Sequence, residues 1–97
     1  MTGRIAKMKT FYVYILLMAN GQLYTGFTGD LQNRVTEHSQ GKVASTRHRR
    51  PVELIHAERY CLESDARRRE RFLKTTEGKR LLRQQIRDIL RAKGVIV

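Results

Sequence analysis

The chain has 97 residues, which is enough for one domain and too few for two. Lys and Arg outnumber Asp and Glu by 20 to 9, so the formal net charge is +11. A charge this large exceeds what solubility needs and favours a polyanionic partner, of which nucleic acid is the commonest in a cell. The single cysteine, Cys61, excludes an internal disulfide and a cysteine-based zinc cluster, and it favours a cytoplasmic location.

Residues 10–90 are expected to form the domain, with 1–9 and 91–97 as terminal extensions. The apolar stretch from Phe11 to Ala19 follows two lysines and resembles a weak signal peptide. It is too short to span a bilayer, and it runs into Asn20-Gly21 rather than a small-residue cleavage site. We therefore interpret it as a buried strand and expect no membrane partner.

The pattern predicts three strands, because β-branched and aromatic residues concentrate at 11–18, 22–27 and 52–60. A first helix is expected from Asp30, its N-cap, to about Ser39. A basic loop from 40 to 50 precedes Pro51 and the third strand. Glu63 opens a second helix to about Thr75, and Gly78 is expected to separate it from a third helix at about 79–93. This order predicts an α+β fold, a small three-stranded antiparallel sheet flanked by helices.

The register of the first hairpin decides which side chains share a face. A two-residue Asn-Gly turn would place Tyr14 and Tyr24 on opposite faces of the sheet. A three-residue loop, Ala19 to Gly21, pairs Tyr14 with Gly26 and brings both tyrosines to one face. The other face then becomes a cleaner apolar set. We favour the three-residue loop, since a misplaced face would expose several side chains whose burial is worth about 1.5–3 kcal/mol each.

Two polar side chains lie on the inward stripe of the first helix. Arg34 and His38 fall with Leu31 and Val35 within roughly 100° of arc. One interpretation is an arginine that reaches to solvent along its stem and a histidine satisfied in the core. The other is a phosphate clamp beside a proton-transfer group, since arginine matches phosphate oxygens and histidine titrates near neutral pH.

Glu70 raises the same question on the second helix, where it shares a stripe with Ala66 and Leu73. A carboxylate on an apolar stripe needs a partner. The structural candidate is one of the neighbouring arginines at 67, 68, 69 and 71. The functional candidate is a divalent cation, because magnesium favours carboxylate and water oxygens.

The spacing of these residues resembles the GIY-YIG nuclease superfamily. Its two name-giving segments read Tyr12-Val13-Tyr14 and Tyr24-Thr25-Gly26 here, and the five matching residues follow in order as Tyr14, Tyr24, Arg34, His38 and Glu70. The chain is most similar to the small, single-domain bacterial branch, whose members are uncharacterised. That similarity covers roughly residues 10–90 and includes the segment from Arg49 to Leu54.

The resemblance implies hydrolysis of a phosphodiester with one metal ion. Glu70 would hold Mg²⁺ or Mn²⁺, and Tyr14 would position or deprotonate the attacking water with help from His38. Arg34 would stabilise the phosphorane, and Tyr24 would complete the hydrogen-bond network. Two departures from the family pattern stand against this: no asparagine follows Glu70, where Gln85 is a candidate substitute, and Phe27-Thr28 stands where many members have a lysine.

The remaining basic residues are predicted to bind the nucleic-acid backbone with little sequence preference. They form two groups, a loop cluster and a stripe on the third helix opposite its apolar residues: Arg47, Arg49 and Arg50, and Arg80, Arg83, Arg87 and Arg91. The alternative for each group is a solvated face. The function expected from the sequence is a metal-dependent DNA endonuclease, with branched, damaged and single-stranded DNA as candidate substrates. The alternatives are a non-catalytic nucleic-acid-binding protein on a degenerate nuclease fold and a factor that binds RNA or the ribosome.

Overall fold

Three antiparallel strands form the centre of the molecule in the computed structural model, which describes residues 9–95. The elements in chain order are β1 (Phe11–Met18), β2 (Leu23–Thr28), α1 (Leu31–Ser39), the short 3-10 helix η1 (Arg47–Arg49), β3 (Val52–Tyr60), α2 (Glu63–Leu73), α3 (Thr76–Gln85) and α4 (Arg87–Ala92). The strand order is β2-β1-β3, with β1 in the centre. The α+β fold expected from the sequence is therefore confirmed.

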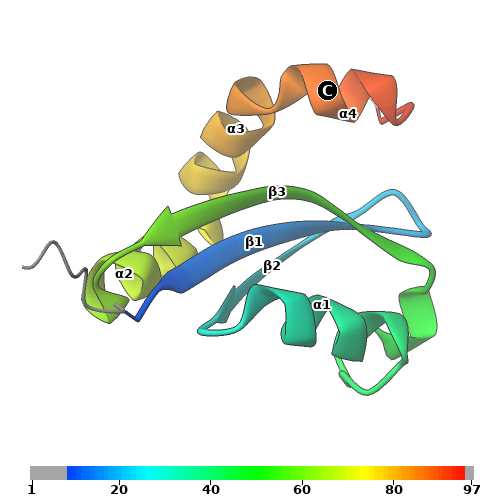
Figure 1. The fold of residues 1–97 in the computed structure, drawn as a ribbon. Coiled ribbons are helices and arrows are strands. Elements are labelled where there is room, and N and C mark those ends of the chain that lie inside the picture. Colours follow the sequence, from blue (N-terminus) through cyan, green and yellow to red (C-terminus); the bar gives the residue numbers. More distant parts are fainter. Residues whose placement is uncertain (1–8, 96–97) are drawn as a thin grey trace, which may run out of the picture.

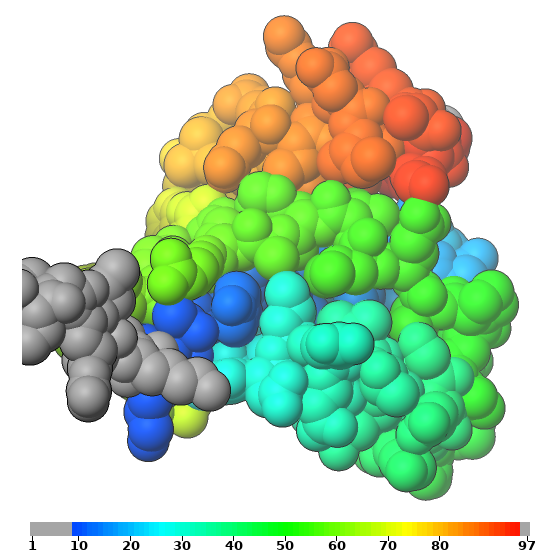
Figure 2. Space-filling view, viewed as in Figure 1, coloured from blue at the N-terminus to red at the C-terminus, as the bar shows by residue number. Residues whose placement is uncertain are grey.

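Helices cover both faces of the sheet. Helix α1 lies on one face, and α2, α3 and α4 lie on the other (Figure 1). Alternate residues of β1 divide between them: Val13 and Ile15 join the apolar core beneath α2–α4, whereas Tyr14 contacts His38 of α1. The edge strand β3 lies between α1 and the pair α3 and α4 in Figure 2. No helix within residues 9–95 is long and apolar enough to cross a membrane.

The first hairpin has the register that the segregation of side chains predicts. Tyr14 pairs with Gly26 and Leu16 pairs with Tyr24. The loop is closed by Met18 N donating to Gln22 O at 2.9 Å, and Gly21 has a φ of 84°, in the left-handed region that favours glycine. The three-residue loop is thus confirmed over the two-residue turn.

Helix α1 begins as expected, because the Asp30 side chain accepts a hydrogen bond from the Asn33 amide at 3.1 Å. The prediction for the third helix was wrong. Two short helices, α3 and α4, replace it, and they meet at Ile86, whose φ of −109° and ψ of 26° interrupt the helix. Both helices still contribute to the core, through Leu82 and Leu90.

Gly78 does not separate two helices, as predicted, but lies buried in the first turn of α3. Thr75 is the N-cap, and its hydroxyl accepts a hydrogen bond from the Gly78 amide at 3.0 Å. A Cβ atom at position 78 would collide with the backbone carbonyl of Phe72 at the end of α2. Glycine is therefore required here by the close approach of two helices, and not by a break in the chain.

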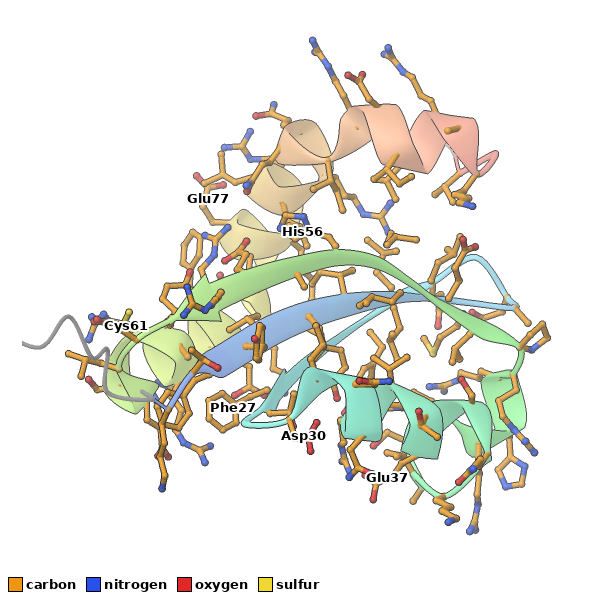
Figure 3. All side chains as sticks on the ribbon, viewed as in Figure 1. Phe27, Asp30, Glu37, His56, Cys61 and Glu77 are labelled. Carbon is orange, nitrogen blue, oxygen red and sulfur yellow. The ribbon has the colours of Figure 1, made fainter. Side chains whose placement is uncertain are left out.

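A polar cluster ties β3 to α2 and α3. The Glu58 carboxylate accepts hydrogen bonds from Tyr60 at 2.8 Å and from Arg69 at 2.9 and 3.1 Å, and it pairs with His56 at 3.0 Å. Burial alone would raise the pKa of Glu58, but hydrogen bonds from Arg69, His56 and Tyr60 outweigh it and lower the pKa to about 2. His56 lies on the α3 side of β3 (Figure 3).

Replacing Gly78 with alanine is expected to lower the free energy of unfolding by about 1–3 kcal/mol, because backbone must move to make room for the methyl group. This loss exceeds the gain of about 1 kcal/mol that alanine brings to a helix interior. Gly29→Ala is the matched control, since a Cβ there meets nothing within 4 Å. Chemical denaturation measures both, and a Gly78→Ala protein as stable as the control would contradict the packing argument.

Candidate functional site

Three aromatic rings from three different elements, β1, β2 and α1, meet on the α1 face of the sheet. The ring centroids of Tyr14 and Tyr24 are 6.3 Å apart, and each contacts the imidazole of His38 edge-on, at 5.7 and 5.1 Å. The register of β1 and β2 brings the tyrosines together, and the inward stripe of α1 brings the histidine. The prediction that both tyrosines share one face is confirmed, and His38 meets them there.

Gly26 explains why the second tyrosine segment ends in glycine. It is the cross-strand partner of Tyr14, and a Cβ atom at position 26 would collide with the end of the Tyr14 ring. The phenol of Tyr14 therefore occupies the space at Gly26 that the side chain of any other residue would fill. The glycine fixes where the Tyr14 hydroxyl points.

His38 is fully buried and has a hydroxyl on each side. Its Nε2 lies 2.8 Å from the Tyr14 hydroxyl, and its Nδ1 lies 2.7 Å from Oγ1 of Thr46, which is also fully buried. Burial, followed by the positive charge of Arg34, lowers the pKa of His38 below its ordinary value. The imidazole is therefore neutral at neutral pH.

Arg34 lies beside the Tyr14 hydroxyl and also pairs with Glu37 at 3.1 Å. Its side chain is 38% exposed, so it reaches from the inward stripe to solvent. Burial raises the pKa of Tyr14 to about 12, although the Arg34 guanidinium acts in the opposite direction. Tyr14 is consequently a neutral phenol in the free protein, beside a cation that would stabilise its anion.

Glu70 of α2 acts on the same phenol through its charge, which also raises the pKa of Tyr14. Its side chain is only 18% exposed, and its carboxylate accepts a hydrogen bond from Lys74 at 3.1 Å. The structural candidate for its partner, one of the neighbouring arginines, does not pair with it. Arg67 is engaged by Glu63 and Arg69 by Glu58, whereas Lys74 lies one helical turn further on.

A comparison with known families identifies the domain. Residues 10–83 match the model of the GIY-YIG catalytic domain. This chain belongs to the GIY-YIG family. The family is one of nucleases, so its substrates are nucleic acids.

GIY-YIG relatives of similar size occur in bacteria and archaea. A UPF0213 protein of Natronomonas pharaonis is 48% identical over 65 residues, which cover 66% of this chain and 76% of that protein. One from Staphylococcus epidermidis is 45% identical over 69 residues, covering 70% and 84%. The solution NMR structure of the UPF0213 protein from Bacillus halodurans shares 33% identity and a TM-score of 0.52, over 78% of this chain and 84% of that one.

GIY-YIG nucleases are generally metal-dependent, so the donors near Tyr14 matter. Residues 9–95 contain no group of three or more His, Cys, Asp or Glu side chains that could hold a metal ion. Mg²⁺ does not need one, because it commonly takes one or two carboxylates and completes its shell with water and phosphate oxygens. Glu70 fits such a site, provided that Lys74, whose side chain is 56% exposed, turns away.

Gln85, the candidate substitute for the family asparagine, has another partner. Its Oε1 accepts a hydrogen bond from Arg69 at 3.1 Å, and Arg69 in turn binds Glu58. Glu58 pairs across the sheet with Val13, and it therefore points to the face opposite Tyr14. Gln85 thus belongs to the polar cluster that holds β3, α2 and α3 together.

The predicted nucleic-acid-binding arginines differ in their surroundings. In the loop, Arg49 and Arg50 donate to backbone carbonyls of the same segment, Arg50 to Arg47 O at 3.0 Å. The four arginines of the predicted stripe do not lie on one helix, since α3 ends before Arg87. Arg80 pairs with Glu77 at 2.8 Å, and Arg83 lines a groove with Leu82 against β2 rather than pointing away from it. Arg87 and Arg91 are exposed on α4.

Sequence reasoning missed Thr46 and the role of Gly26. Thr46 lies in a polar loop without periodicity, so no pattern marks it as buried. Gly26 had a detectable signal, because the three-residue loop register already placed it opposite Tyr14.

The buried neutral His38 makes stability depend on pH. Above pH of about 6.5, the ordinary histidine pKa, neither the folded nor the unfolded chain is protonated at this position. As the pH falls from there toward the lower pKa of the folded state, the unfolded chain takes up a proton first, and stability is lost. We expect the melting temperature of the wild type to fall more steeply between pH 7 and 5 than that of His38→Gln.

His48→Gln is the control for this measurement, since His48 is exposed. It should retain the pH dependence of the wild type. Equal slopes for the wild type and His38→Gln would contradict the assignment of a buried neutral imidazole. The slopes are compared rather than the absolute melting temperatures, because His38→Gln also removes two buried hydrogen bonds.

Proposed function

We propose that this protein is a divalent-cation-dependent endonuclease that hydrolyses phosphodiester bonds in DNA. The observation that supports it best is the hydrogen bond between the buried Tyr14 hydroxyl and Nε2 of His38, with Arg34 beside the phenol. Any buried tyrosine hydroxyl needs a hydrogen-bond acceptor, but a tyrosine that only packs does not need a cation beside the same oxygen. The net charge of +11 adds the electrostatic attraction for a polyanionic substrate.

The proton chemistry follows from the two perturbed pKa values. A free tyrosinate is costly here because burial raises the pKa of Tyr14 to about 12. A relay avoids it: as water attacks the phosphorus atom, its proton passes to the Tyr14 oxygen while the phenol proton passes to Nε2 of His38. The new bond joins the water oxygen to phosphorus, and the bond to the leaving oxygen breaks. The leaving alkoxide then takes a proton from solvent. The imidazolium of the buried His38 returns its proton to the Tyr14 oxygen, while the proton that this oxygen took from water passes on to solvent.

The other residues act on charge and position. Arg34 presents a guanidinium to the phosphate oxygens, which gain negative charge as water adds. Tyr24 packs against both the phenol and the imidazole and holds them in contact. Glu70 would hold a divalent cation, Mg²⁺ or Mn²⁺, which supplies neutralisation of phosphate charge when bound.

A second candidate is a nucleic-acid-binding protein that does not cleave. The ion pair between Glu70 and Lys74 favours it, because the proposed metal ligand already has a cationic partner. The two functions differ in what a cleavage screen finds with branched, duplex and single-stranded DNA and with RNA, each with Mg²⁺, Mn²⁺ and chelator. Cleavage only of RNA would contradict the assignment of DNA as substrate.

Replacing Glu70 with glutamine is expected to lower metal-dependent cleavage by about 100-fold or more, because a metal ion contributes several kcal/mol of transition-state stabilisation. Lys74→Gln is the matched control, since it breaks the same ion pair from the other end. It should leave cleavage intact. Each variant should melt close to the wild type, because i,i+4 ion pairs on a helix are worth about 0.3–0.5 kcal/mol.

Comparing these two variants distinguishes a Glu70 that binds the metal ion from a Glu70 that only pairs with Lys74. If Glu70 serves only Lys74, both variants lose the same small amount of stability and cleave equally well. Undiminished cleavage by folded Glu70→Gln would contradict the metal assignment. A wild type that binds DNA and cleaves no substrate in the screen would favour the second candidate.

DNA affinity is expected to fall steeply with salt and to change little with sequence. The logarithm of the binding constant should fall linearly with the logarithm of salt concentration, by about 0.9 for each phosphate contact. Arg47→Ala should reduce that slope by about one, whereas Gln84→Ala, an exposed uncharged control, should not change it. Fluorescence anisotropy with two unrelated duplexes measures both effects. A strong preference for one duplex that persists at high salt would contradict backbone binding.

A further inference from the structure

Thr46 is one of two fully buried polar residues in residues 9–95, and the other is His38, which it contacts. Its backbone is held by the loop: the Thr46 amide donates to Val43 O at 3.2 Å, and Thr46 O accepts from the Arg49 amide at 2.9 Å. Val43 is buried beside it. The hydroxyl therefore reaches Nδ1 of His38 from a fixed position, 2.7 Å away.

We propose that Thr46 is a positioning residue that sets the tautomer of His38. Its Oγ1 accepts the Nδ1–H hydrogen bond, so that Nε2 carries a free lone pair toward the Tyr14 hydroxyl. The catalytic meaning of this arrangement rests on the proposed nuclease function, but the tautomer itself is a property of the free protein.

The surroundings of the Tyr14 oxygen favour a hydrogen bond in which the phenol donates and Nε2 of His38 accepts. A neutral phenol has one proton to donate, and Tyr14 is only 1% exposed. Arg34, which also hydrogen-bonds the hydroxyl, has donors and no acceptor, whereas Glu70 acts on the phenol through its charge alone. If Nε2 carried the imidazole proton, the Tyr14 oxygen would face two donors, and its own proton would have no partner among them. The unprotonated Nε2 is the acceptor that satisfies it.

The Thr46 hydroxyl can also accept a hydrogen bond from Nδ1 when His38 is protonated. Both ring nitrogens of imidazolium are donors, so a group beside Nδ1 must accept in that state. The Thr46 hydroxyl has lone pairs for this in both states, and no side chain has to move when the Tyr14 proton passes to Nε2. A valine at position 46 has the same shape without the acceptor, and it leaves the Nδ1–H unpaired in a buried space.

The direct test is to determine the tautomer of His38 by NMR in the protein without metal or substrate. The ¹⁵N chemical shifts and long-range couplings of the imidazole report which ring nitrogen carries the proton. We expect Nδ1 protonated and Nε2 unprotonated in the wild type and in Thr46→Ser, which retains the hydroxyl. Thr46→Val should populate the opposite tautomer. A wild type with its proton on Nε2 overturns the proposal, and this outcome needs no variant.

Cleavage kinetics supply the second readout. Thr46→Val should lower kcat by about 10–100-fold, as loss of the partner that orients a functional histidine does elsewhere, and should leave KM within about twofold. In the pH profile of kcat, the fall in rate at low pH should move to lower pH in Thr46→Val, because the imidazolium loses its acceptor and the pKa of His38 falls. Thr46→Ser should keep the wild-type profile. A folded Thr46→Val protein with the wild-type tautomer and kcat overturns the proposal.

The two failures are distinguishable. If the wild type has the expected tautomer, Thr46→Val changes it, and no substrate is cleaved, then Thr46 positions His38 and the nuclease function alone is wrong. If cleavage occurs and requires Tyr14 but is indifferent to Thr46→Val, the nuclease function stands and the role of Thr46 is refuted.

Discussion

The pairing of Tyr14 with Gly26 across β1 and β2 determines where a site can form in this fold. A slip of one residue would send Tyr14 or Tyr24 to the opposite face, where Val13 and Ile15 build the core. The three-residue loop with Gly21 in the left-handed region fixes the register at one end. The missing side chain at position 26 then leaves room for the phenol, so two glycines position one hydroxyl.

Helix α1 has to meet that hydroxyl, and its burial pattern explains how. His38 is completely buried and satisfied on both nitrogens, which by itself fits a core histidine. A core histidine and a proton-transfer histidine are compatible interpretations here. The neutral imidazole with both nitrogens hydrogen-bonded is also the state from which the proposed relay starts. Low pKa on the imidazole and high pKa on the phenol keep the proton on Tyr14 until a phosphate and water arrive.

Local patterns predicted the parts of the fold that local physics determines. The hairpin, the Asp30 cap of α1 and the third strand follow from turn chemistry, capping and side-chain alternation. Gly78 was misread because helical glycine is usually a breaker, and its real cause is contact with Phe72, a tertiary fact. The Thr75 cap was a local signal for the correct boundary. Thr46 had no signal of either kind, since its burial depends on where the loop crosses α1.

The distribution of carboxylates explains how one chain attracts a polyanion and keeps a negative charge in its site. Seven of the nine acidic residues make ion pairs and Asp30 caps α1, so few free carboxylates oppose phosphate. The Glu58 side chain is only 15% exposed, and three side chains donate hydrogen bonds to its carboxylate. Replacing these partners with a metal ion would therefore be costly. Glu70 is held by one exposed lysine in a pair worth about 0.3–0.5 kcal/mol. Of these two carboxylates, Glu70 is therefore the one that can change partners when a metal ion and a phosphate approach, and it is the one whose charge acts on Tyr14.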